Sequence, residues 1–389
     1  MRITFLCGSL EPGRDGVGDY TRLLAKECVR HGHACSLVAL NDRHIETVGT
    51  AVPLTGSGES VTLRLPASLP WSERIELAKR QIEASNPDWI SLQFVCYGFH
   101  PKGLIHGLGD KLRPVVAGRN LHLMFHELWI GDARIASLKH RLVGAFQRRF
   151  ILQMVQKLKP KVIHSSTPVY VGMLGQHGVE ATQLPLFGNI PVIVNDAHSS
   201  GFPTEFAAER ISGDRNDWWV AILFGTIHPE WKPEPLFRIL RSAATRSEKR
   251  IGVVSVGRLT AAGEKLWQQM RDQDAGDLAF VRMGEQPASR ISSLLQMADF
   301  GIATSPLQLI GKSGSASAMI EHGLPVIANR DDWHPRCPTL KTATHDPLVH
   351  PLDEHLEGKL LRGLKRGTAA ARSPSIAADF VNNLLAALA

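Results

Sequence analysis

Residues 311–328, GKSGSASAMIEHGLPVIA, read as a loop of small polar residues, one short helix, a glycine stop and a buried strand. Serine and glycine at a helix start leave several backbone N–H groups without partners, and the positive end of the helix dipole lies there too. Such a corner attracts phosphate, and Lys312 adds a cation to it. We therefore predict phosphate contacts from Lys312, Ser313, Gly314 and Ser315. The alternative is an ordinary serine-capped helix.

A second glycine-rich turn lies near the start of the chain. Residues 1–7 predict a buried strand, residues 21–31 predict a helix, and Gly16 and Gly18 lie in the turn between them. Glycine lets the backbone approach a sugar or a diphosphate closely, and α/β proteins bind ligands at this edge of a parallel sheet. The alternative is a tight turn without a ligand. The two corners together predict a ligand held between two similar domains.

The length of 389 residues predicts two domains of roughly 180 residues each. We expect an N-terminal domain over 1–190, a C-terminal domain over 191–372, and an amphipathic helix over 373–389 that packs back on the first domain. Short apolar runs alternate with helical patterns in both halves, which predicts an α/β fold with parallel sheets. The predicted strands after the first are 34–40, 89–94, 121–125, 161–164, 218–225, 251–257, 278–283, 300–304 and 325–329. The polar stretch 198–217 is predicted to connect the domains.

Composition narrows the class of protein. Hydrophobic residues at 43% and charged residues at 21% are typical of a globular chain, and the longest apolar runs are strand-sized, short of the roughly 20 residues that span a membrane. The five cysteines are scattered and lack CxxC spacing, so neither a disulfide framework nor zinc is indicated, and a reducing cytoplasm fits. The net charge of +7 favours anionic partners in general.

His126 and Glu127 follow a predicted strand, at the edge where α/β proteins bind ligands. His126 could hydrogen-bond a sugar hydroxyl or a developing charge, and Glu127 could act as the general base of an inverting enzyme. The alternative for His126 is a histidine satisfied within a loop. The pair lacks the HExxH spacing of a zinc site.

These stretches resemble a nucleotide-sugar glycosyltransferase of the GT-B type, closest to the retaining group that includes sucrose synthase and bacterial mannosyltransferases. Residues 16–20 (GVGDY), with a helix and the HGH of 31–33, resemble that family's first glycine loop. Residues 125–127 (FHE) resemble its strand-end histidine with an acidic neighbour. Residues 321–327 (EHGLPVI) resemble its G-x-P-V-I strand. The resemblance spans most of the chain and implies two Rossmann-like domains that face each other across a cleft.

The chain departs from the family at one pair of positions. Two glutamates usually lie eight positions apart before the G-x-P-V strand, and they fall here on Ile310 and Ala318, while Glu321 is displaced by three residues. The VGRL of 256–259 matches a family motif but is expected on the second strand of its domain, where the match is coincidental. At the expected place the nearest cation is Lys232, a further predicted phosphate ligand.

The resemblance implies a metal-independent hexosyltransferase of polysaccharide biosynthesis without a cofactor. It would move a hexose, with retention, from a UDP- or GDP-sugar to a carbohydrate or lipid-linked acceptor. The predicted catalytic residues are His126 and Glu127, and the predicted donor ligands are Gly16, Gly18, Lys232, Lys312, Ser313, Gly314, Ser315 and Glu321. Two alternatives stay open: a sugar-nucleotide epimerase or hydrolase on the same fold, and a catalytically degenerate binding subunit.

Residues 138–161 predict a long helix with many lysines and arginines on one face and apolar residues on another. Such a helix could rest on anionic lipid at the inner face of the membrane, close to a lipid-linked acceptor. A solvated basic face on a packed helix explains the pattern equally well. Few aromatic residues interleave with the basic ones and no nucleic-acid motif is present, which argues against nucleic acid as a partner.

Overall fold

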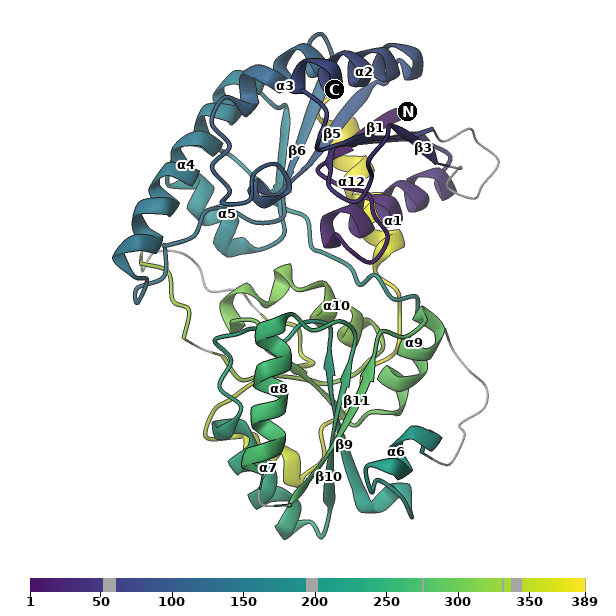
Figure 1. Cartoon of the computed structure of the whole chain (residues 1–389), viewed down its shortest axis with the longest axis vertical. Coiled ribbons are helices and arrows are strands. Elements are labelled where there is room, and N and C mark those ends of the chain that lie inside the picture. The colour runs from purple at the N-terminus through teal and green to yellow at the C-terminus, as the bar shows by residue number, and fades with distance from the viewer. Residues whose placement is uncertain (52–60, 194–201, 275, 331, 337–344, 389) are drawn as a thin grey trace. The chain divides into compact units, whose positions relative to one another are not determined.

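The computed structural model describes the chain except for residues 52–60, 194–201, 275, 331, 337–344 and 389. Cys337 and the first part of the 198–217 stretch lie outside the described residues. The chain divides into two compact units. The first comprises Met1–Leu186, a short segment that begins at Pro335, and Ser373–Ala389, and the second comprises Phe187–His334 and Thr344–Arg372. Each unit contains one mainly parallel sheet with helices packed on it (Figure 1).

The first sheet has eight strands within the described residues, in the order β3-β4-β2-β1-β5-β6-β7-β8, and all neighbours are parallel except β3 and β4. In chain order the strands are β1 (Arg2–Cys7), β2 (Ala34–Asp42), β3 (Gly49–Ala51), β4 (Thr62–Pro66), β5 (Trp89–Phe94), β6 (Asn120–Phe125), β7 (Val162–Ser165) and β8 (Thr182–Gln183). The first strand thus lies inside the sheet, as in doubly wound folds.

Helices connect these strands. They are α1 (Gly16–Arg30), α2 (Trp71–Ser85), the 3₁₀ helix η1 (Cys96–Gly98), α3 (Leu108–Val116), α4 (Leu138–Leu158), α5 (Pro168–Gly175) and, at the end of the chain, α12 (Ser373–Ala386). Helix α1 begins five residues earlier than the sequence predicted, because the Asp15 carboxylate accepts the Gly18 N–H at 2.8 Å and caps the helix there. Gly16 and Gly18 therefore lie in the first helical turn.

The second sheet has six strands within the described residues, all parallel, in the order β11-β10-β9-β12-β13-β14. They are β9 (Trp218–Phe224), β10 (Arg250–Val256), β11 (Leu278–Gly284), β12 (Phe300–Ala303), β13 (Val326–Ala328) and β14 (Val349–Pro351). The α/β prediction with two parallel-sheet domains is confirmed. The helices of this unit are α6 (Thr204–Ala208), η2 (Arg215–Asp217), α7 (Glu234–Arg246), α8 (Ala261–Gln273), α9 (Ala288–Met297), η3 (Leu307–Lys312), α10 (Gly314–Glu321) and α11 (Leu356–Leu361).

Strand β9 is apolar throughout because both of its faces are buried. Val220 and Ile222 pack in one core together with residues of α9 and α10. Ala221 and Leu223 point to the other face, into a core with residues of α7, α8 and α11. This alternation places α7 and α10 on opposite faces of the second sheet.

The predicted connection over 198–217 is wrong for its described part. Phe206 on α6 and Ile211 are both fully buried in the core of the second unit. These two apolar residues anchor an otherwise polar segment to the sheet, so it belongs to the second unit. The chain passes from one unit to the other between Leu186 and Phe187.

Helix α12 packs on the first unit beside α1, and Figure 1 shows the yellow helix next to the purple one. Phe380 is fully buried, and its ring centroid lies 5.8 Å from that of Phe5 on β1 and 5.0 Å from the imidazole of His122 on β6. The last helix thus completes the core of the first unit.

Phe380→Ala should lower the stability of the first unit by about 3–5 kcal/mol, because it removes a buried aromatic ring and leaves a cavity. Amide hydrogen exchange in β1 and β6 measures the loss directly. Leu385→Ala, a change at a 46% exposed side chain of the same helix, is the matched control. Equal exchange rates in the two variants would show that α12 is not part of this core.

Candidate functional site

The order of the second sheet reverses between β9 and β12. The chain leaves β9 toward β10 and β11 on one side, then returns to the other side to form β12, β13 and β14. The helix after β9 covers one face and the helix after β12 covers the other. The loops at these two carboxyl ends therefore diverge, and such a reversal is where open α/β sheets bind ligands.

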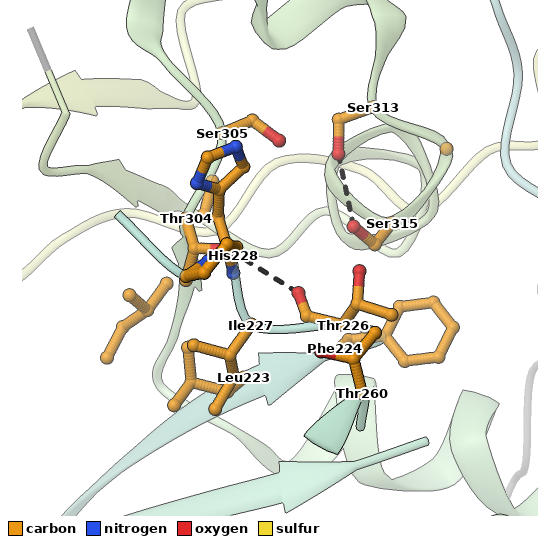
Figure 2. Close-up of a pocket in the computed structure, with 14 residues that line it drawn as sticks. Leu223, Phe224, Thr226, Ile227, His228, Thr260, Thr304, Ser305, Ser313 and Ser315 are labelled. Carbon is orange, nitrogen blue, oxygen red and sulfur yellow. Dashed lines mark hydrogen bonds between the residues drawn. The ribbon is translucent and has the colours of Figure 1, made fainter. Parts of the chain in front are cut away.

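A pocket of about 310 Å³ lies at this point (Figure 2). Four segments of the second unit line it: the end of β9 with the loop after it, the end of β12 with the residues after it, the start of α10, and Thr260 at the N-cap of α8. Figure 2 shows the polar side chains that border it, namely Thr226, His228, Thr260, Thr304, Ser305, Ser313 and Ser315. Most of these are hydroxyls, which can donate hydrogen bonds to phosphate or sugar oxygens.

The first turn of α10 supplies backbone donors to the pocket. Ser313 is the N-cap, and its hydroxyl accepts the Ala316 N–H at 3.2 Å and lies 3.1 Å from the Ser315 hydroxyl. The N–H groups of Gly314 and Ser315 have no acceptor within the helix, as at every helix start. The prediction that Ser313, Gly314 and Ser315 begin a helix at a ligand edge agrees with this geometry, and all three line the pocket.

Cationic side chains surround His228. Burial lowers the pKa of His228, and the positive charges of Arg330 and Lys312 lower it further. Glu230 and Asp332 oppose them in part, and both pair with the guanidinium of Arg330, at 3.0 and 2.8 Å. A bound anion would complete this cluster.

Arg330 is only 5% exposed, and its Nη1 atom is buried without a hydrogen-bond partner among the described residues. A buried guanidinium N–H without an acceptor is costly unless a ligand or water supplies one. Sequence reasoning missed Arg330 and His228, because their proximity depends on the order of the strands and not on a local motif. Thr304 was missed too, and its Oγ1 accepts the His228 N–H at 3.1 Å.

Lys232 does not line the pocket. Its residue is exposed, and its carbonyl oxygen accepts a hydrogen bond from the Asn329 side chain at 3.1 Å. The expectation that the VGRL match lies on the second strand of its domain is confirmed. Arg258 follows β10 and pairs with Glu285 at 2.5 Å.

The two positions at which the resembling family carries glutamates are core positions here. Ile310 is 7% exposed and Ala318 is fully buried, both in one hydrophobic core. A Cβ added to Gly188 would lie 2.5 Å from the Cα of Ala318, so the two backbones touch. A glutamate side chain at position 318 would therefore have no room, because Ala318 packs against the backbone of Gly188.

Glu321 lies at the far end of α10 from Ser313. Its carboxylate is 3% exposed and accepts the Gly188 N–H at 2.8 Å. Burial raises the pKa of Glu321 to about 7, while the Gly188 N–H and the charge of Arg372 limit the rise. The observed contact of Glu321 is thus with the segment that enters the second unit, and its predicted role toward a donor stays a prediction.

In the first unit, Gly18 is required by a close backbone contact. A Cβ on Gly18 would lie 2.4 Å from the carbonyl oxygen of Ser9, in the loop after β1. Gly16 is exposed, and a Cβ there would meet no atom within 4 Å. Gly18 therefore allows α1 to pack against this loop, whereas Gly16 is open to solvent.

His126 follows β6 and is 5% exposed. Its Nε2 atom lies 2.8 Å from the side-chain oxygen of Gln93, and its ring makes an edge contact with Tyr20 of α1, with centroids 4.9 Å apart. Burial lowers the pKa of His126 to about 3, so the imidazole is neutral. Glu127 is half-buried near Cys96, and burial followed by the charge of Glu127 raises the pKa of that thiol to about 12.

Comparison with known proteins addresses the fold. No family model matches the chain, and no curated protein matches its sequence. Solved structures match over nearly its whole length. HepE of Anabaena, in complex with UDP and glucose, is 16% identical, with 99% of this chain and 98% of that chain covered and a TM-score of 0.50. The trehalose 6-phosphate synthase of Burkholderia multivorans is 10% identical, with 99% and 93% covered and a TM-score of 0.57.

The chain has the GT-B fold. A third structure of similar fold is the UDP-GlcNAc 2-epimerase of Methanocaldococcus jannaschii, at 9% identity, with 99% of both chains covered and a TM-score of 0.50. Transferases and an epimerase thus share this architecture with the chain. Among the described residues of this GT-B chain, no group of three histidine, cysteine or acidic side chains is placed to hold a metal ion.

The raised pKa of Glu321 makes stability depend on pH. The native state keeps a proton on this carboxyl up to about pH 7, while the unfolded chain releases it near pH 4.5, so stability falls as the pH rises through that window. Glu321→Gln keeps an acceptor for Gly188 without the charge. Its stability relative to wild type should therefore increase between pH 4.5 and 7, toward about 3 kcal/mol, and then level off.

Urea unfolding of the second unit at pH 5, 6, 7 and 8 measures this difference. Glu354→Gln, at an 85% exposed side chain, is the control and should show no such trend. A constant difference between Glu321→Gln and wild type at all four pH values would contradict the buried, protonated carboxyl.

Proposed function

We propose that the chain transfers a hexose from a nucleoside-diphosphate sugar to a carbohydrate or lipid-linked acceptor. The observation that supports this most strongly is the pocket at the strand reversal of the second unit. It combines the start of α10 with hydroxyls, and Lys312, His228 and the buried Arg330 lie nearby. Backbone donors at a helix start and adjacent cations are the groups that bind a diphosphate.

The chemistry follows from where charge develops. When the bond between the sugar C1 and the diphosphate oxygen breaks, negative charge grows on the leaving diphosphate. The N–H groups of Gly314 and Ser315 are held in place by the helix and would stabilise that charge, and the ammonium of Lys312 would add to it. The acceptor hydroxyl forms the new bond to C1 as the bond to the diphosphate breaks, and its proton passes to the leaving diphosphate oxygen. UDP and GDP are the proposed bases of the donor, retention of configuration is the proposed outcome, and no metal takes part in the step.

Residues of the first unit are proposed to contact the substrate as well. His126 would hydrogen-bond a sugar hydroxyl, and Glu127, next to it, would act as the general base if the reaction inverts the configuration. Gly16 is exposed at the start of α1, where a ligand can approach the backbone without meeting a Cβ. Gly18, Lys232 and Glu321 remain weaker proposals because their observed contacts serve packing or lie outside the pocket.

A second function, epimerisation of a nucleotide sugar, is supported by the likeness in fold to the UDP-GlcNAc 2-epimerase. A hydrolase belongs with it, since both reactions consume the donor without an acceptor. Ile310 and Ala318 are buried at the two positions where the resembling family carries glutamates. This supports a third function, a subunit that binds a nucleotide sugar without turnover. Donor consumption measured with and without acceptors separates the three.

Lys312→Ala should weaken binding of the nucleoside diphosphate about tenfold, because it removes one charge-assisted contact to phosphate. Thermal-shift titration of wild type with UDP, GDP and ADP identifies the base first, since a ligand at 100 times its Kd stabilises by about 2.7 kcal/mol. The matched control is Lys249→Ala. Lys249 lies just before β10, at the opposite edge of the same sheet, where its amine binds the Asn216 carbonyl.

The control should bind like wild type. An equal loss in both lysine variants would point to general electrostatics and not to the α10 corner. The absence of any shift in wild type with all three nucleotides would overturn the proposed donor.

We also propose that the first unit contacts an anionic membrane through the start of α4. Ile135, Leu138, Leu142 and Phe146 are 56–74% exposed, and the last three lie four residues apart on one stripe of the helix. Exposed basic residues flank the stripe: Arg134, Lys139, Arg141 and Arg149. An apolar stripe bordered by cations fits the boundary between acidic headgroups and acyl chains.

The rest of α4 packs inward, so the proposed face is shorter than the helix. Met154 and Leu158 are buried, and the ring of Phe150 contacts that of His106 with centroids 5.3 Å apart. No helix among the described residues has the length and apolar character that crossing a membrane requires. Contact would therefore be at the surface of the bilayer.

Replacement of Leu138, Leu142 and Phe146 by serine should reduce binding to vesicles that contain phosphatidylglycerol at least tenfold, since each loses about 1 kcal/mol or more of apolar burial. Co-sedimentation measures it, and binding should also fall with added salt. Leu385→Ser on α12 is the control. Equal binding of the triple variant and wild type, or equal binding to neutral phosphatidylcholine vesicles, would contradict the membrane proposal.

A further inference from the structure

Five polar side chains of the first unit form a continuous hydrogen-bonded chain inside its sheet. All are between 0 and 5% exposed. The chain runs from His126 Nε2 to Gln93 Oε1 at 2.8 Å, from Gln93 Nε2 to Ser91 Oγ at 2.8 Å, from Ser91 Oγ to His122 Nδ1 at 2.8 Å, and from His122 Nε2 to His164 Nδ1 at 3.0 Å.

The strand register brings these residues together. Ser91 and Gln93 are two apart on β5 and so point to the same face, and Ser91 lies opposite His122 on β6. Gln93 lies opposite Met124 of β6, which in turn lies opposite His164 of β7. Aromatic rings cover this face: Tyr20 of α1 contacts His126 and Phe380 of α12 contacts His122. The polar chain is thus shielded from water.

The amide of Gln93 fixes the direction of the two hydrogen bonds that it makes. Its oxygen can only accept, so the proton of the first bond must belong to His126 Nε2. Its nitrogen donates to Ser91 at 2.8 Å. The Ser91 hydroxyl can then either donate to His122 Nδ1 or accept from it, so the direction of the bonds beyond Ser91 is not set by Gln93.

We propose that Gln93 is a positioning residue that holds His126 as the Nε2–H tautomer, so that Nδ1 is a hydrogen-bond acceptor for a hydroxyl of the bound sugar. In the structure Nδ1 makes no hydrogen bond to any described residue and is the ring nitrogen left for a ligand. A neutral imidazole carries one N–H only, and that N–H is committed to Gln93. This inference rests on the proposed function for the identity of the ligand, but not for the tautomer.

Because the three histidines are neutral, the tautomer of His126 decides whether its free ring nitrogen donates or accepts a hydrogen bond. Burial lowers the pKa of His126 to about 3 and that of His164 to about 4, and burial together with His164 lowers the pKa of His122. Near neutral pH none of them carries a second proton. Whether His126 accepts or donates toward a ligand is then set by which nitrogen holds its one proton.

Nitrogen-15 NMR of the histidine side chains in the ligand-free protein tests the tautomer. His126 should carry the proton on Nε2. His322 is an internal reference for the opposite form, because its Nδ1 lies 2.7 Å from the Ala318 carbonyl oxygen, which can only accept. A proton on Nδ1 of His126 would mean that the Gln93 amide is reversed, and it would overturn the inference.

Gln93→Leu tests the positioning role. It removes both amide bonds at similar volume, and His126 should then populate both tautomers in the NMR spectrum. Affinity for the sugar nucleotide should fall at least fivefold, with no change in affinity for the free nucleoside diphosphate, since the proposed contact of His126 is with the sugar. Ser36→Ala is the control, because it removes another buried hydrogen bond of the same sheet, to Thr4 at 2.7 Å.

The two failures are distinguishable. Loss of affinity for both ligands, or for neither, in Gln93→Leu would overturn the positioning role, as would an equal loss in Ser36→Ala. If wild type binds no nucleoside diphosphate, the proposed function fails instead, while the NMR result still decides the tautomer.

Discussion

Strand β9 begins the second sheet at its centre, and the chain then builds outward in both directions. Parallel strands have all their carboxyl ends on one edge, and each needs a crossover that packs on a face of the sheet. Because the crossovers after β9 and β12 lie on opposite faces, their loops separate and leave the edge between them open. The pocket, the start of α10 and the approach of Lys312 and Arg330 to His228 all depend on this strand order.

Close packing of α10 limits what the pocket can recognise. Gly188 touches the backbone of Ala318, and a Cβ on Gly301 would lie 2.3 Å from the sulfur of Met319. Small residues are therefore needed along this helix, and carboxylates that could bind a ribose or a sugar are excluded from positions 310 and 318. The polar groups that line the pocket are hydroxyls, backbone N–H groups and the His228 imidazole, with Lys312 and Arg330 near His228, and these groups suit phosphate. Affinity should come mainly from the diphosphate.

The sequence predicted what depends on local pattern. Strand β5 was predicted with the bounds that the structure shows, and helix α4 was predicted with its observed start but ends at Leu158 instead of 161. An apolar run and a helical repeat are each read from consecutive residues. The start of α1 was predicted five residues too late, because Gly16 and Gly18 suggested a turn where the Asp15 carboxylate caps the helix. The helix start at Ser313–Ser315 was predicted from its small side chains, and its role toward phosphate stays a prediction. His228 and Arg330 were not predicted, because they are far apart in the chain and only the order of the strands brings them together.

The polar residues that concern function lie in different places in the two units, and the difference matters for His126. In the second unit the polar groups follow the strand ends and remain open to a ligand. In the first unit Ser91, Gln93, His122 and His164 lie within strands, where each must find a partner because water is excluded. An apolar residue at any link would leave its neighbours unsatisfied. The tautomer of His126 is therefore set by Gln93 on the neighbouring strand β5, and it cannot be read from the histidine and its neighbour Glu127 alone.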